Sequence, residues 1–64
     1  MPKLEKIKAG DKLWDYRNRN TYWPVEIVSV DLQKRTAIII WNFNATRPTT
    51  VNEAYIEKLR IKEP

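Results

Sequence analysis

The chain has 64 residues, with 12 Lys and Arg against 8 Asp and Glu, no Cys and no His. This length allows one domain, and the missing thiols and imidazoles exclude a disulfide framework and the usual zinc sites. The formal net charge of +4 suits an anionic partner such as nucleic acid. Because no apolar run is long enough for a signal peptide or a membrane span, we expect an intracellular protein, cytoplasmic or nuclear.

The N-terminal residues divide into a charged segment and the start of a folded domain. We expect residues 1–8 to form an arm, as a frayed helical turn or an extended segment, and residues 9–62 to form a single barrel. Gly10 is the only glycine, and it predicts a turn between the two because glycine tolerates positive φ.

Four segments have the alternation or the β-branched composition of strands, and short polar turns rich in Asn separate them. In the first, alternation places Leu13 on one face and Trp14 with Tyr16 on the other. In the second, Trp23, Val25 and Ile27 share a face. The predicted strands cover residues 13–17, 22–30, 36–41 and 46–51.

The C-terminal part predicts a short helix. Asn52 is a suitable N-cap for a helical turn over 53–55, and residues 57–61 form either a last short strand or a continuation of the helix. The expected fold is mostly β: a small SH3-like, five-stranded, partly open barrel with one helical turn near the C-terminus. The competing fold is a three-stranded sheet packed on a C-terminal helix.

The sequence lacks the residue types of an active site, since it has no His base, no Cys nucleophile and no glycine-rich phosphate loop. Its acidic pairs, Asp11 with Asp15 and Glu53 with Glu57, are typical of solvated surfaces. We therefore expect a binding protein with no enzymatic activity, no cofactor and no metal.

The seven aromatic residues are the most informative set. All of them except Tyr55 lie near predicted strand ends, whereas the mid-strand positions expected to form the core carry aliphatic residues: Val25, Ile27, Ile38, Ile39 and Ile40. Aromatic side chains at one end of a barrel suggest a recess that binds a cation through its ring faces or stacks with nucleobases. The alternative is that the rings only fill the end of the barrel.

Most of the chain resembles a known family. The stretch from Lys8 to Leu59, with "KAGDKL", "YWPVEIVSVD", "IIIWNFN" and "NEAYIEKL", is similar to a single Tudor domain, and the pattern is shared by PWWP, chromo-barrel and integrase C-terminal domains. Tyr16 precedes Trp23 by seven residues and Trp23 precedes Trp41 by eighteen, which is how three cage aromatics of the Tudor family are spaced. Where the family carries a Tyr-Gly-Asn turn, this chain has Phe43-Asn44-Ala45.

The resemblance implies a Tudor-like fold and a ligand, a methylated Arg or Lys side chain or a short peptide, held by an aromatic cage. Carried over position by position, the implied binding residues are Tyr16, Trp23, Trp41, Phe43 and Asn44.

The charge pattern indicates a second function, which is binding of nucleic acid. Loop arginines around the aromatic end would repel a methylated cation and attract a phosphate backbone whose bases stack on the rings. Asp15 and Glu26 would restore a negative lip if the strand register faces them towards the recess. A third possibility is an adaptor that pairs with a protein partner through an exposed strand edge. The predicted nucleic-acid contacts are Arg17, Arg19, Lys34, Arg35 and Arg47.

Overall fold

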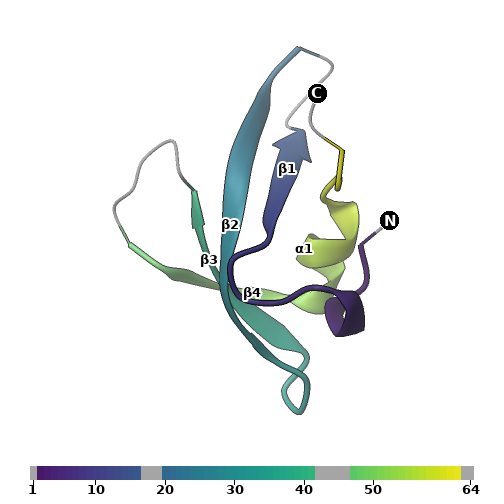
Figure 1. Cartoon of the computed structure of the whole chain (residues 1–64), viewed down its shortest axis with the longest axis vertical. Helices are drawn as coiled ribbons and strands as arrows, with labels where there is room; N and C mark the ends of the chain where they lie inside the picture. Colours follow the sequence, from purple (N-terminus) through teal and green to yellow (C-terminus); the bar gives the residue numbers. More distant parts are fainter. Residues whose placement is uncertain (1, 17–19, 42–46, 63–64) are drawn as a thin grey trace.

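Four antiparallel strands in the order β1-β2-β3-β4 form one curved sheet, which is the framework of the computed structural model (Figure 1). The structure describes residues 2–16, 20–41 and 47–62. The predicted mostly-β class is confirmed, and each predicted strand corresponds to an observed one. The strands are β1 (Lys12–Tyr16), β2 (Tyr22–Asp31), β3 (Thr36–Trp41) and β4 (Thr49–Asn52).

Two short helical segments cover one face of this sheet. The first is a 3-10 turn, η1 (Leu4–Lys6), and the second is the α-helix α1 (Glu53–Lys58). Asn52 caps α1 as predicted, because its side-chain oxygen accepts a hydrogen bond of 2.9 Å from the backbone N–H of Tyr55. Figure 1 shows η1 and α1 next to each other on the same side of the sheet, where α1 also contacts β3 and β4.

The strand register determines which side chains meet this covered face. Residues directly opposite each other in an antiparallel pair point to the same side. Leu13 of β1 lies opposite Val25 of β2, and Ile27 of β2 lies opposite Ile39 of β3. All four are buried. We call this covered side the inner face of the sheet.

A bulge in β2 keeps apolar side chains on the inner face beyond Ile27. The register shifts between Ile27 and Ser29, so that Val28 is the extra residue and Val30 comes to lie opposite Ala37. Without this extra residue, strict alternation would send Val30 to the outside. The bulge therefore explains why the sequence leaves the two-residue period here.

The core combines strand residues with residues from both helical segments. Leu4 of η1 is fully buried, so the segment expected to form an arm belongs to the packed domain. Ile38 and Ile40, which were expected in the core, lie on the outer face and are half-buried. The buried hydrophobic residues are Leu4, Leu13, Val25, Ile27, Ala37, Ile39, Ile56 and Leu59.

The chain returns to the free edge of β1 after α1. Trp14 and Arg60 exchange two backbone hydrogen bonds, of 2.8 and 2.9 Å, and form an isolated antiparallel bridge. Residues 57–61, expected as a strand or a helical continuation, extend α1 as far as Lys58 and then make this single bridge. Among the described residues the sheet is thus open and four-stranded, without a fifth strand.

The burial of Leu4 predicts the first mutational result. Leu4→Ala should lower the free energy of unfolding by about 2–5 kcal/mol, because it leaves a cavity beneath η1. The matched control is Leu32→Ala, since Leu32 is 51% exposed in the β2–β3 turn and its truncation should change stability by less than about 0.5 kcal/mol. Urea denaturation followed by tryptophan fluorescence measures both. Equal effects would show that η1 does not pack on the core.

Candidate functional site

The sheet divides the described aromatic side chains between its two faces. Trp23 lies opposite Asp15, and Trp41 lies opposite Val25, so both tryptophans share the inner face with the core. Tyr16 lies opposite Tyr22 on the outer face. The structure therefore brings two of the implied cage residues, Trp23 and Trp41, to one side and places another, Tyr16, on the other.

On the inner face, a tyrosine from α1 joins the two tryptophans. The rings of Trp41 and Tyr55 are nearly perpendicular, with centroids 6.4 Å apart and an angle of 81° between their planes. The indole Nε1–H of Trp41 donates to the Tyr55 hydroxyl at 3.3 Å, and that hydroxyl donates to Oδ2 of Asp15 at 2.5 Å. Asp15 is only 8% exposed. Helix and sheet are thus linked by a short chain of polar groups.

Trp23 is the third ring of this set, which we call the inner aromatic group: Trp23, Trp41 and Tyr55 with Asp15. Because Val25 is the direct partner of Trp41, Trp23 lies diagonally across β2 and β3 from Trp41. Diagonal neighbours are about 7–8 Å apart, which large rings span. Trp23, Trp41 and Tyr55 are all half-buried.

The residues predicted for the site do not include Tyr55. For Asp15 the sequence indicates only a possible negative charge, because its direction depends on the strand register. A signal for Tyr55 existed, since it directly precedes Ile56, which faces the core from the same helical turn. The inward facing of Asp15 follows only from the register of β1 with β2.

The outer face carries a second cluster, which we call the outer aromatic group: Trp14, Tyr16 and Tyr22. Tyr22 contacts both other rings, with centroids 5.9 Å from Trp14 and 5.8 Å from Tyr16. The guanidinium carbon of Arg60 lies 4.6 Å from the centre of the Tyr16 ring, within the range of a cation–π contact. Tyr22 is 45% exposed.

Four of the predicted site residues lie outside the described residues. They are two of the implied cage positions and two of the loop arginines: Phe43, Asn44, Arg17 and Arg19. Their predicted roles stay predictions.

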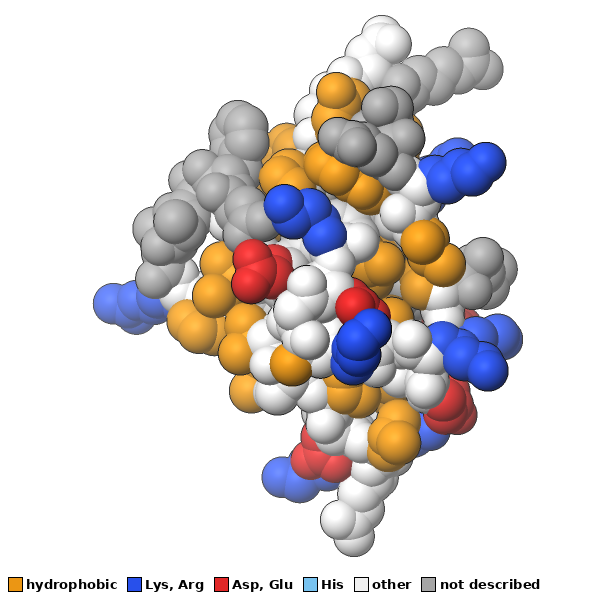
Figure 2. Space-filling model, in the orientation of Figure 1, with side chains coloured by type: hydrophobic (Ala, Val, Ile, Leu, Met, Phe, Trp, Pro, Cys, Tyr) orange, Lys and Arg blue, Asp and Glu red, His pale blue; other side chains and the backbone are white. Residues whose placement is uncertain are grey.

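The basic residues that the structure does describe do not gather at one place. Lys34 and Arg35 lie in the turn before β3. Arg47 lies two residues before Thr49, the first residue of β4, and Thr49 pairs with Ile39 towards the other end of β3. Lys34 and Arg47 are exposed. Figure 2 shows the Lys and Arg side chains of one face spread apart, several with an acidic side chain beside them.

Arg35 has partners within the fold. It is the only described non-glycine residue with positive φ, 57°, and its guanidinium pairs with Glu53 of α1 and, at 2.8 Å, with Glu5 of η1. The hydrogen bond from Arg35 lowers the pKa of the Glu5 carboxyl, and both carboxylates raise the pKa of the guanidinium. Arg35 therefore holds the turn, η1 and α1 together, rather than presenting an unneutralised cation.

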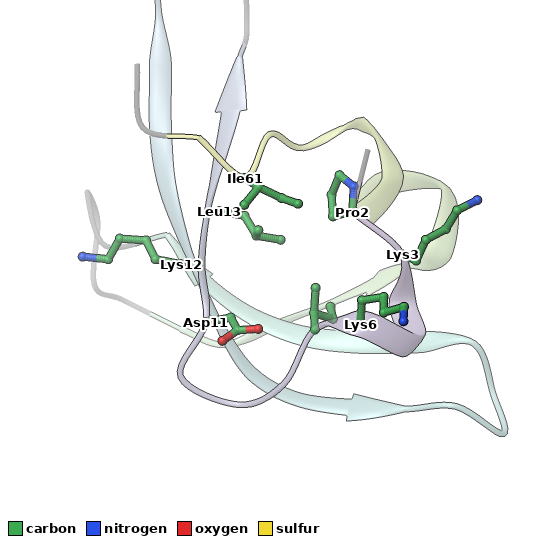
Figure 3. A pocket seen from close by; sticks show the side chains of 8 residues that line it. Pro2, Lys3, Lys6, Asp11, Lys12, Leu13 and Ile61 are labelled. Carbon is green, nitrogen blue, oxygen red and sulfur yellow. The ribbon is translucent and has the colours of Figure 1, made fainter.

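A pocket of about 330 Å³ lies away from both aromatic groups, between the N-terminal segment and β1 (Figure 3). Leu13 and Ile61 point across it towards Pro2, whereas Lys12 points away on the other side of β1. Among residues 2–16, 20–41 and 47–62, no aromatic side chain lines this pocket. It is therefore not the predicted aromatic recess.

Within the described ranges, no group of three or more His, Cys, Asp or Glu side chains is close enough to hold a metal ion. Of the helices formed by these residues, none is long and apolar enough to cross a membrane.

Comparison with family models, with curated proteins and with solved structures finds no match for this chain.

The hydrogen-bonded chain from Trp41 to Asp15 predicts a second mutational result. Tyr55→Phe should lower the free energy of unfolding by about 1–3 kcal/mol, because the Asp15 carboxylate loses a donor and the Trp41 N–H loses an acceptor in a largely buried setting. Tyr22→Phe, on the exposed side of the sheet, is the matched control and should be nearly neutral. If thermal denaturation shows the same loss for both variants, the Tyr55 hydroxyl has no structural role.

Proposed function

We propose that this chain is a non-enzymatic binding module that holds the methylated end of a Lys or Arg side chain, presented by a peptide, against the inner aromatic group. One observation carries the proposal: Trp41 and Tyr55 stand nearly perpendicular on the same face as Trp23. The Trp41 N–H donates to the Tyr55 hydroxyl, and that hydroxyl donates to Asp15. The ligand class follows from the chemistry of these groups.

A methylated ammonium or guanidinium keeps its positive charge but has fewer N–H donors and a larger apolar surface. Ring faces attract such a cation through their quadrupoles, and two rings at 81° contact a rounded group from two directions. The hydroxyl of Tyr55 and the N–H of Trp41 lie in the planes of their rings. The hydrogen bond between these groups therefore orients both rings through atoms at their edges and does not use the ring faces.

Asp15 supplies the negative charge that complements a bound cation. The residue is 8% exposed, and a charge shielded from water interacts more strongly with a nearby ion than one in bulk solvent. The proposed site thus combines apolar ring surface with one acidic group, which favours a methylated cation over an anion or a neutral side chain.

This site keeps part of the cage that the Tudor resemblance implies. Trp23 and Trp41 are retained, and Tyr55 with Asp15 takes the place of Tyr16. Phe43 and Asn44 follow Trp41 in the chain after Asn42, and their contribution stays part of the proposal. The negative charge of Asp15 also offsets the repulsion that loop arginines would exert on a cationic ligand.

A finer description of the fold belongs to the same proposal: a partly open, SH3-like barrel of the Tudor type. Two features support it. The chain leaves the far edge of the sheet at β4, crosses through α1, and pairs at Arg60 with the opposite edge at Trp14. We interpret this bridge as the remnant of a fifth strand that brings the two ends of the sheet together.

An NMR titration that follows the three indole N–H signals tests the proposed site. Peptides carrying trimethyl-lysine or dimethyl-arginine should shift the signals of Trp23 and Trp41, and the unmodified peptides should not. Trp14 lies on the outer face and is the internal control. Equal shifts at all three indoles, or none with any methylated peptide, would contradict the proposal.

Two substitutions make the test specific. Trp41→Ala should weaken binding of the methylated peptide about tenfold, since a cation–π contact removed from water contributes about 1–2 kcal/mol. Asp15→Asn keeps an acceptor for the Tyr55 hydroxyl but removes the charge, so it should weaken binding while the fold, monitored by the amide spectrum, is preserved. Unchanged affinity in both folded variants would exclude the inner aromatic group as the site.

A further inference from the structure

We propose that the outer face of β1 and β2 is a second binding surface, which takes single-stranded nucleic acid. On this surface Trp14, Tyr16 and Tyr22 stack with bases, and Lys12 and Arg60 contact phosphates. The surface differs in place and in residues from the inner aromatic group and does not depend on the function proposed there. It also differs from the loop arginines to which the charge pattern alone pointed.

The first support is the arrangement of the rings. Tyr22 is the centre of the cluster, in contact with Trp14 at 5.9 Å and with Tyr16 at 5.8 Å, and 45% of its surface is exposed. These rings do not pack into the core, because the core lies on the opposite face of the sheet, beneath η1 and α1. Every base offers a flat π-face, so a ring cluster of this kind binds unpaired bases with little sequence preference.

The second support is the charge around the rings. Arg60 lies over the Tyr16 ring at 4.6 Å, and Lys12 occupies the outer position of β1 two residues before Trp14. Neither cation makes an ion pair with another described residue, in contrast to Arg35, which two carboxylates neutralise. Glu26, opposite Lys12, is the acidic residue among the paired positions on this face of β1 and β2.

The exposed rings and the neighbouring cations together indicate the class of ligand. A cation placed on Tyr16 repels a methylated ammonium, so this cluster is unsuited to the ligand proposed for the inner face. A polyanion with exposed bases satisfies both the cations and the rings, whereas duplex DNA hides its base faces within the stack. The net charge of +4 acts in the same direction.

Fluorescence anisotropy with labelled oligo-dT and oligo-U tests the rings. The wild-type chain should bind at least one of these strands, and more tightly than a duplex of the same length. Tyr22→Ala should weaken binding about tenfold, because one base loses its stacking partner. Leu32→Ala removes a side chain of similar exposure from the far β2–β3 turn and should leave the affinity unchanged.

A salt titration tests the cations. Arg60→Gln should reduce the slope of log K against log salt by about 0.7, the value for one phosphate contact on a single strand. Lys34→Gln removes the same charge from the β2–β3 turn and should leave the slope as it is. No binding of either strand, equal or tighter binding of the duplex, an unaffected Tyr22→Ala variant, or equal slopes for the two charge variants would each overturn the proposal.

Discussion

The alternation of side chains in an antiparallel sheet is the constraint on which the rest of this structure depends. Once Leu13 is fixed opposite Val25, and Ile27 opposite Ile39, alternation fixes the facing of their neighbours in β1, in β2 up to the bulge, and in the paired part of β3. A slip of one residue would exchange the core face for the solvent face. The burial of these four side chains therefore also decides which aromatic residues can act together.

The consequence for function is a separation of two aromatic surfaces with opposite electrostatic character. The inner aromatic group includes Asp15, whereas the outer aromatic group lies beside Arg60 and Lys12. A ligand attracted to one is repelled by the charges of the other. Read along the sequence, the same rings form a single set, and this is why methyl-ligand and nucleic-acid hypotheses compete for the same residues until the strand register is known.

A domain of this size has a small core, so contacts between distant segments matter for its stability. Arg35 joins the β2–β3 turn to η1 and α1 through Glu5 and Glu53, and the Tyr55 hydroxyl joins α1 to β1 through Asp15. Exposed ion pairs contribute little individually. Here they act with the burial of Leu4 and Ile56, and together these contacts close the inner face of the sheet.

Much of the fold could be predicted because local chemistry determines it. Gly10 has a φ of 95°, as its place in a turn requires, and Asn52 caps α1 through its own side chain. What could not be predicted depends on long-range pairing. The register of β1 with β2 places Tyr16 opposite Tyr22, so the family-like spacing of Tyr16 from Trp23 does not bring those two rings together. In the same way, no local pattern reveals that Arg35 is neutralised by residues 30 and 18 positions away.

Both proposed binding surfaces require that the two aromatic groups lie on opposite faces of one sheet. A two-dimensional NOE spectrum of the free protein tests it most directly. We expect cross-peaks between the rings of Trp41 and Tyr55 and between those of Tyr16 and Tyr22, with none between Tyr16 and Trp41. Cross-peaks between the Tyr16 ring and the indole of Trp41 would contradict this separation, because they would place both rings in a single cage.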